Sequence, residues 1–341
     1  MNLVAVAASA IERMPLPDGM ARAGIAALVG RTSRKLARLP ANAEQAFAEA
    51  MCDHPIALFT DDANVQHYEL PPAFFGYVLG PHRKYSCCLY PDADTTLGQA
   101  EEYALAATAA HAMLADGQAI LELGCGWGSL SLWMADHFPA ANITAVSNSR
   151  PQRLHIEDAA ARRGLTNLRV ITADMNVFST EQRFDRVVSV EMFEHISNWR
   201  SLLNRIGDWL LPDGRLFLHV FSHHATPYRF DHTDKADWIA QHFFTGGIMP
   251  SHNLIRHVAA PFELEADWRW SGTHYARTAD HWLERYDANA EPIEQILRDT
   301  YSADWALWQR RWRLFFLATS GLFGAMAGRE WGVSHYRLCR R

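Results

Sequence analysis

The sequence predicts an α/β protein built around a mostly parallel sheet that has one antiparallel edge region. Short apolar runs alternate with helical segments between residues 119 and 220, as in strands that are buried between two layers of helices. A glycine-rich turn at residues 124–128 joins the first strand to the helix that follows it. Two more apolar runs, after residue 260, can add strands to the edge of the sheet.

The N-terminal part of the chain is predicted to be mainly helical. Helices are expected at residues 20–39 and 41–52. The opening MNLVAVAASA is interpreted as a further helix, because it lacks the positive n-region and the longer apolar run of a signal peptide. Residues 67–88 are loop-like and aromatic, and a long helix with a threonine cap is expected at 95–114.

The central and C-terminal elements follow from the alternation of apolar runs. Strands are expected at 119–124, 142–146, 168–174, 185–191 and 215–220, with helices near 129–138, 150–164 and 196–211. The pattern then breaks into a polar, histidine-rich and aromatic stretch. A strand at 262–270, helices over about 278–325 and a last strand at 331–339 complete the chain.

Composition excludes several classes of function. The 341 residues carry a formal net charge of −6, so a general nucleic-acid partner is not expected. Five cysteines without a CxxC spacing indicate a reduced, cytoplasmic protein with no structural metal site. His223, His224 and His232 are interpreted as a solvated loop, because no second set of ligands accompanies them at a defined spacing. No apolar run reaches the roughly 18 residues that a membrane span requires.

The glycine turn points to a ligand that lies close to the backbone at the carboxyl ends of the strands. Its spacing is GxGxG rather than the GxGxxG of dinucleotide sites, the second strand ends without a ribose-binding acid, and no P-loop Gly-Lys-Ser/Thr is present. Glu122 precedes the turn, Asp174 ends the third strand, and the ionisable cluster Glu191-Met192-Phe193-Glu194-His195 ends the fourth. This is the layout of S-adenosylmethionine-dependent methyltransferases.

An ordered set of motifs identifies the family. The chain resembles the cyclopropane fatty acid synthase-like methyltransferases, and most closely their coclaurine N-methyltransferase branch. The matching segments are YSCC (85–88), ELGCGWG (122–128), AVSNSRPQ (145–152), ADM (173–175), EMFEHI (191–196), HYART (274–278), WLERYDAN (282–289) and EWGVSH (330–335). The resemblance implies a Rossmann-like class I methyltransferase sheet with an N-terminal helical region and a helical insertion over the active site.

This resemblance also implies a division of the chain into four parts. Residues 1–90 would form a helical cap and a cofactor-covering loop, and residues 91–220 the core that binds the cofactor. Residues 221–325 would form a substrate-cap insertion that includes the strand near 262–270. Residues 326–341 would supply the final strand of the core.

The cofactor would be S-adenosylmethionine, with S-adenosylhomocysteine as product. Tyr85 and Ser86 are expected at its carboxylate end, and Glu122, Gly124 and Gly126 along the methionine and ribose. Ser147, Ser149 and Gln152 are expected at the ribose. Asp174 and the Met175 backbone are expected at the adenine. For Ser147 and Ser149, a helix cap is an alternative role.

The resemblance implies methyl transfer to a small-molecule acceptor, most simply an amine. Only a neutral amine is nucleophilic, so a base must take its proton. Glu194 and His195 are the expected pair, with Glu191 supporting substrate binding. Aromatic walls would attract a cationic centre; the candidates are Trp238, Phe243, Phe244, Trp268, Tyr275 and Trp331.

Two other readings of the site stay open. In the lipid branch of the family a bound bicarbonate is the base for methylation of an unsaturated acyl chain, and the matching positions are Cys87, Glu194, His219, Phe221 and Tyr275. The segment 219–223, which includes His223, would border the acceptor. Peripheral membrane contact would follow only from lipid chemistry. The other alternative is a non-catalytic cofactor-binding module, and a homodimer is possible in each case.

Overall fold

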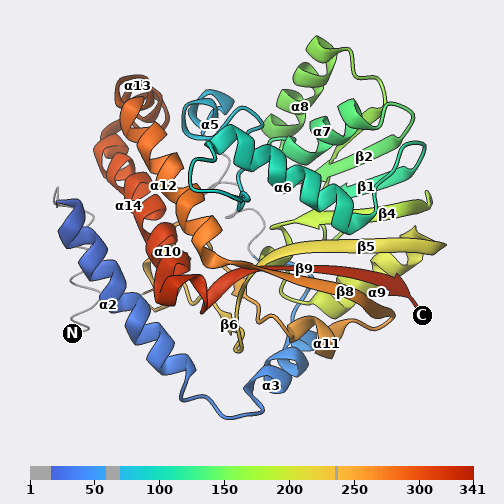
Figure 1. Cartoon of the computed structure of the whole chain (residues 1–341), viewed down its shortest axis with the longest axis horizontal. Coiled ribbons are helices and arrows are strands. Elements are labelled where there is room, and N and C mark those ends of the chain that lie inside the picture. Colours follow the sequence, from blue (N-terminus) through green and yellow to red (C-terminus); the bar gives the residue numbers. More distant parts are fainter. Residues whose placement is uncertain (1–16, 59–69, 235–236) are drawn as a thin grey trace.

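The computed structural model describes residues 17–58, 70–234 and 237–341, and the expected helix at the opening of the chain lies outside them. Seven strands form one sheet in the order β3-β2-β1-β4-β5-β9-β8 (Figure 1). They are β1 (Ala119–Leu123), β2 (Asn142–Ser147), β3 (Leu168–Thr172), β4 (Phe184–Val190), β5 (Leu210–His223), β8 (Phe262–Ser271) and β9 (Trp331–Arg340). The first five pair in parallel, whereas β9 is antiparallel to both β5 and β8. The predicted mostly parallel sheet with an antiparallel edge is confirmed.

Helices cover both faces of the sheet. On one face, α6 (Leu97–Ala112) and α7 (Ser129–His137) pack on Ile120, Val188 and Phe217. On the other, α3 (Ala43–Ala50), α9 (Trp199–Trp209) and α11 (Leu254–Val258) pack on the neighbouring residues Leu121 and Val187. Successive side chains of a strand point to opposite faces, so β1 and β4 are apolar on both. The helix α8 (Arg150–Arg163) runs beside β3.

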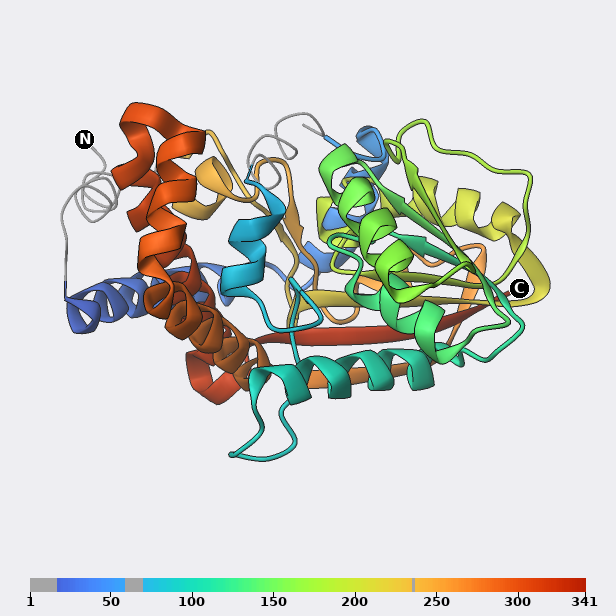
Figure 2. The ribbon, with the colours of Figure 1, turned by 90° about the horizontal axis from the view of Figure 1, so that it is seen from above.

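A separate helical layer lies at the carboxyl ends of the parallel strands. It contains α12 (Gly272–Ala288), α13 (Ala290–Tyr301) and α14 (Trp305–Gly324), joined by α2 (Asp18–Leu36), α5 (Pro72–Val78) and α10 (Trp238–His242). Figures 1 and 2 show these helices beyond one end of the sheet. The position follows from topology, because α12 begins where β8 ends and β8 runs in the direction of the parallel strands. The layer therefore covers the edge where a ligand is expected.

Most predicted elements differ from the structure by a few residues at their ends, and three of the differences lie near the carboxyl ends of the parallel strands. The strand expected at 215–220 continues to His223, because the polar Ser222 and His223 pair with Gly332 and Trp331 of β9. The helix expected at 196–211 starts at Trp199, after a 3₁₀ turn over Phe193–His195. The long helical stretch begins six residues earlier than expected, at Gly272, and is divided into three helices.

The described parts of the chain contain no helix that is long and apolar enough to cross a bilayer. The polar stretch 221–255 is not all loop. It contains the short strands β6 (Tyr228–Arg229) and β7 (Ile248–Met249), which pair with each other, as well as α10 and α11.

Candidate active site

The glycine turn brings bare backbone to the edge of a cavity. Gly124, Gly126 and Gly128 all have positive φ, a conformation that glycine adopts without strain. A Cβ at Gly124 would lie 2.5 Å from the side chain of Met192, and one at Gly128 would lie 2.6 Å from Ile156. At Gly126 the space next to the backbone is open. The turn is therefore packed from behind and open in front, as close approach of a ligand requires.

This glycine-loop cavity is lined by the segments that the sequence singles out. Its walls are Ala57, Leu58, Gly124, Gly126, Val146, Ser147, Asn148, Gln152, Ala173, Asp174, Met175, Glu191, Met192, His195 and Ile196. Apart from Ala57 and Leu58, they come from the ends of β1, β2, β3 and β4 and from the residues that follow them; these strands adjoin in the sheet. Six predicted cofactor contacts thus meet in one place with two predicted catalytic residues: both glycines, Ser147, Gln152, Asp174 and Met175, with Glu191 and His195.

Polar groups around the end of β2 are arranged for a ligand and for a helix cap at once. Ser147 donates its hydroxyl to Gln152 Oε1 at 2.6 Å, which turns the Gln152 side chain toward the cavity. Ser149 accepts from the Gln152 backbone N–H and caps α8, so it has the alternative role. The Gln152 Nε2 group is buried and has no hydrogen-bond partner among the described residues. A buried donor of this kind needs a polar partner, which a bound ligand can supply.

Four predicted cofactor contacts lie outside the walls of this cavity, and one of them is the capping residue Ser149. Glu122 is buried beneath the turn, where it accepts from the Ser131 hydroxyl, and burial raises its pKa to about 7. Ser86 accepts from Lys84 Nζ at 2.5 Å. Tyr85 belongs to the neighbouring cavity described below.

The carboxylate of Glu191 is the centre of the polar cluster. It follows β4 with a φ of 48°, a strained conformation for a residue other than glycine. Its Oε1 accepts from the Cys87 backbone N–H at 2.9 Å and contacts His219 Nε2 at 3.2 Å, and its Oε2 accepts from the Tyr275 hydroxyl at 2.6 Å. Burial raises the pKa of Glu191, against the charge of Lys84 and the Cys87 hydrogen bond, which lower it.

Glu194 and His195 occupy different environments although they are adjacent. Glu194 is fully buried, and its Oε1 accepts from the Phe221 backbone N–H at 2.6 Å. Burial, helped by the charge of Glu191, raises the pKa of Glu194 well above its ordinary value and so favours the protonated form of this carboxyl group. His195 lines the cavity, and burial lowers its pKa to about 4, so its ring is neutral.

A second, aromatic cavity opens on the other side of Glu191 and His195. It is lined by Tyr85, Glu191, His195, Phe221, Phe230, Ile239, Phe244, Met249, Tyr275, Trp282, Phe315, Thr319, Leu322 and Phe323. The His195 ring stacks on Phe244 with centroids 5.0 Å apart. The two cavities share only Glu191 and His195, so these two side chains mark the place where two bound molecules would meet.

Several candidates from the sequence lie away from both cavities. Trp268 stacks on His111 with centroids 3.9 Å apart, on the face of the sheet that α6 covers. Trp331 is fully buried against His223, whose Nε2 lies 3.6 Å from Glu330. Phe243 packs on Phe315 inside the helical layer. These side chains fill the protein and do not line either cavity.

The sequence analysis missed most of the wall that α14 contributes. Phe315, Thr319, Leu322 and Phe323 all line the aromatic cavity. Their spacing of i, i+4, i+7 and i+8 places them on one face of a helix, which is the signal that could have found them. The pattern does not reveal whether that face meets a ligand or another helix.

Comparison with known proteins gives relatives over most of the chain. The profile of the mycolic acid cyclopropane synthetase family matches residues 59–321. The (S)-coclaurine N-methyltransferase of Thalictrum flavum subsp. glaucum is 33% identical over 285 residues, which are 82% of this chain and 79% of that protein. The cyclopropane-fatty-acyl-phospholipid synthase of Escherichia coli strain K12 is 29% identical over 270 residues, 79% of this chain and 66% of that protein.

Solved structures agree with these relatives. A coclaurine N-methyltransferase bound to N-methylheliamine and S-adenosylhomocysteine has a TM-score of 0.93 and 30% identity, with 97% of each chain covered. A cyclopropane synthase from Mycobacterium tuberculosis has a TM-score of 0.69 and 22% identity, with 83% of this chain and 99% of that chain covered, and shares the fold.

Proposed function

This chain belongs to the mycolic acid cyclopropane synthetase family and is an S-adenosylmethionine-dependent methyltransferase, and we propose that it methylates the nitrogen of a small-molecule amine. The family, the fold, the enzyme class and the cofactor that the sequence predicts are confirmed. The observation that carries the proposal is the carboxylate of Glu191, which lies where the two cavities meet. A non-catalytic role is set aside, since the chain is an enzyme.

The glycine-loop cavity fits the cofactor. Gly124 and Gly126 present bare backbone, Gln152 presents an unpaired amide donor, and Asp174 lines the far end. When bound, S-adenosylmethionine supplies a methyl group on a positively charged sulfur. We assign these four residues to its binding, and the aromatic cavity to the acceptor.

Glu191 is suited to bind an ammonium group and to take its proton. A carboxylate has about four acceptor positions, and Cys87, His219 and Tyr275 use three of them. No described residue donates to the remaining position, on Oε2. An ammonium group from the aromatic cavity can donate there, and the raised pKa of Glu191 favours proton transfer.

His195 and the aromatic walls complete the acceptor site. The neutral His195 ring can hydrogen-bond to the amine without repelling a cation. The ring faces around it attract the cationic product. Glu194 does not reach either cavity, so we place it under the turn that carries His195, as support and not as the base.

The lipid alternative meets a difficulty at the same carboxylate. A bound bicarbonate would need the donors at the Cys87, His219 and Tyr275 positions that the resemblance implies for it. Here these donors hold the Glu191 side chain. The Glu191 carboxylate thus occupies the position where the lipid chemistry requires a bound bicarbonate. This favours an amine over an acyl chain as the acceptor.

The test is transfer of label from S-adenosylmethionine to two acceptor panels. One holds (S)-coclaurine and heliamine, and the other holds phospholipid vesicles with unsaturated acyl chains, with and without bicarbonate. We expect label in the amines, and we expect Glu191→Gln to lower kcat by about 10²–10⁴-fold while cofactor binding persists. Glu263→Gln, at an exposed carboxylate, is the control. Bicarbonate-dependent label in acyl chains would overturn the proposal.

A further inference from the structure

Three histidines connect Glu191 with the surface of the protein next to α6. Glu191 Oε1 lies 3.2 Å from His219 Nε2, His219 Nδ1 lies 2.9 Å from His335 Nε2, and His335 Nδ1 lies 2.9 Å from His111 Nδ1. They come from three elements that are distant in the sequence: β5, β9 and α6. The register places His219 directly opposite His335 in the sheet. Strand pairing therefore fixes the contact between His219 and His335, and the packing of α6 on the sheet adds His111.

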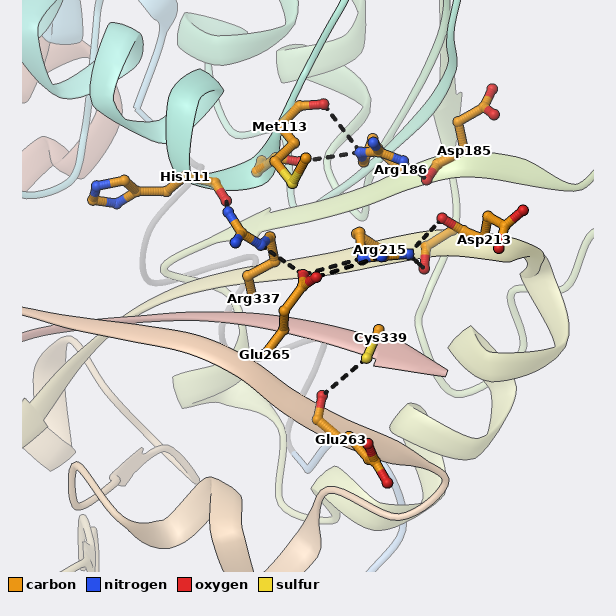
Figure 3. A network of polar contacts seen from close by, with 12 residues as sticks. His111, Met113, Asp185, Arg186, Asp213, Arg215, Glu263, Glu265, Arg337 and Cys339 are labelled. Carbon is orange, nitrogen blue, oxygen red and sulfur yellow. Dashed lines mark hydrogen bonds and ion pairs between the residues drawn. The ribbon is translucent and has the colours of Figure 1, made fainter. Parts of the chain in front are cut away.

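The inner and outer ends of this chain differ in exposure. His219 and His335 are fully buried, and both nitrogens of each ring are used in the chain. His111 is partly exposed, and its Nε2 has no hydrogen bond with any residue that the structure describes. Its ring is held flat against Trp268. Figure 3 shows how Arg337 donates to the His111 carbonyl and so ties α6 to β9.

The hydrogens can be assigned along the whole chain. Burial lowers the pKa of His219 and of His335 well below the ordinary value, so both rings are neutral and carry one hydrogen each. With Glu191 as a carboxylate, His219 donates through Nε2, His335 donates through Nε2, and His111 donates through Nδ1. Every contact then has one donor and one acceptor. The lone pair that remains is on His111 Nε2, at the exposed end.

We propose that His219, His335 and His111 form a proton relay that exchanges protons between Glu191 and water at the surface of α6. The proposal rests on the proposed function, because methyl transfer to an ammonium group releases one proton inside a cavity. Nothing in amine binding itself requires a row of buried histidines behind the carboxylate. A route through the sheet would let the proton leave without opening the cavity that holds the substrates.

The transfer balances at each atom. A proton from water binds His111 Nε2, and the His111 Nδ1 hydrogen moves to His335 Nδ1. The His335 Nε2 hydrogen moves to His219 Nδ1, and the His219 Nε2 hydrogen moves to Glu191 Oε1. One proton has entered, Glu191 is a neutral acid, and each ring is neutral in its other tautomer. The reverse sequence starts from these switched tautomers, carries the proton that Glu191 has taken from the ammonium group to water, and returns the rings to their first tautomers. Each ring regains the switched tautomer by hydrogen exchange between turnovers, before the next proton leaves.

The charged groups around the relay favour neutral rings. Lys84 lies near Glu191, His219 and His335 and disfavours an added charge on either ring. Arg337 acts in the same way on His111. Around Glu191 itself the titratable neighbours are Cys87, Glu194, His195 and Tyr275. The positive charges of Lys84 and Arg337 therefore disfavour an imidazolium ring, so a transferred proton does not accumulate on any of the three histidines.

The first experiment breaks the relay at its exposed end, away from both cavities. In His111→Asn the side-chain amide can still donate to His335 Nδ1 but cannot pass a proton. With heliamine as the acceptor, we expect kcat to fall by about tenfold or more, with KM for both substrates unchanged. The matched control is His137→Asn, because His137 also stacks on a tryptophan (Trp133), at an exposed position away from both cavities.

A second variant separates proton transfer from packing. His111→Ala leaves a gap beside Trp268 that added imidazole can fill, and imidazole should restore most of the lost kcat. A loss of kcat in His111→Asn that imidazole does not restore in His111→Ala would assign His111 a packing role and overturn the relay. Wild-type kcat in His111→Asn would overturn it too.

A third measurement does not depend on any acceptor. In protein labelled with ¹⁵N-histidine, we expect the uncommon Nδ1–H tautomer at His111, identified by its loss in His111→Asn, and Nε2–H tautomers at His219 and His335. If the wild-type enzyme methylates no amine, the proposed function fails. The spectra still show which nitrogen of each histidine carries the hydrogen. An Nε2–H tautomer at His111 with His335 as donor to it would contradict the inward orientation and overturn the scheme.

Discussion

Neighbouring ionisable side chains at this site behave differently because their surroundings differ. Glu191 has donors on both oxygens and lies at the cavity junction, whereas Glu194 is enclosed and held by one backbone N–H. His195 is next in sequence, yet burial keeps it neutral. The sequence analysis made Glu194 and His195 the base pair and gave Glu191 a supporting role in substrate binding. Their exposure and partners assign them separate roles.

Replacement of His195 by alanine tests the proposed role of its ring in positioning the acceptor. The imidazole lies at the meeting point of both cavities, so its loss should misplace the acceptor nitrogen more than the cofactor. We expect kcat to fall by about 100-fold. Calorimetry should find the affinity for S-adenosylhomocysteine little changed. Unchanged turnover would remove His195 from the active site.

Single contacts between elements decide how the helical layer joins the sheet. Gly272 begins α12 at the point where β8 ends and β9 begins, and a Cβ there would lie 2.2 Å from the Trp331 carbonyl and 2.3 Å from that of Phe323. Both of these atoms are backbone, so neither can move without shifting an element. The glycine is thus required by the close approach of three chain segments.

We expect Gly272→Ala to destabilise the protein by roughly 1–3 kcal/mol, since β9 or the end of α14 must shift. Thermal unfolding should show a lower Tm, by about 1–2 °C for each kcal/mol. Gly30→Ala is the matched control, because Gly30 lies inside α2 with open space around it. Alanine there should stabilise the helix by about 0.4–1 kcal/mol. Equal effects of the two substitutions would refute the argument.

The connection between α6 and the loop before Cys87 predicts a pH dependence of stability. Glu101 of α6 is buried and accepts from the backbone N–H groups of His82 and Lys84, at 2.8 and 3.1 Å. Burial raises its pKa to about 7, against these hydrogen bonds, which lower it. A carboxyl group with a raised pKa in the folded state stabilises fully below its unfolded pKa, and this contribution is lost as pH rises through 7.

Denaturant unfolding at a series of pH values measures this effect. The free energy of unfolding should decline between about pH 4.5 and 7, with Glu101 contributing about 3 kcal/mol at most. Glu101→Gln should flatten the decline, because the amide does not titrate. Glu102→Gln, on the neighbouring and more exposed position, should leave the slope as in wild type. The hypothesis fails if both variants retain the full slope.

Across the whole molecule, the sheet could be predicted from sequence more completely than the acceptor site. Buried parallel strands are continuous apolar runs, and their carboxyl ends carry the glycines and acids that we assign to cofactor binding. The aromatic cavity has no such local sign. Phe230 and Phe315 line it, whereas Trp268 and Trp331 do not, and all four are large aromatics in the C-terminal half. Only tertiary packing determines whether such a side chain lines the cavity or fills the core.

The same limit applies to the histidines. His219 and His335 stand in different motifs of the family, and His111 lies in a helix that showed no motif at all. Their adjacency depends on the antiparallel pairing of β5 with β9 and on the placement of α6 beside them. Sequence periodicity predicts that such elements exist, but it does not give the register that brings three rings into line.

The two cavities draw their walls from different parts of the chain. The glycine-loop cavity is built mostly from the ends of the central strands, and the aromatic cavity mostly from α12, α14 and the stretch before β8. Substitutions that change the shape of the aromatic cavity leave the walls of the glycine-loop cavity and their packing in place. An ancestor could therefore have exchanged one acceptor for another in small steps while every intermediate kept its methyl donor, and directed evolution can follow the same path by randomising the inner face of α14.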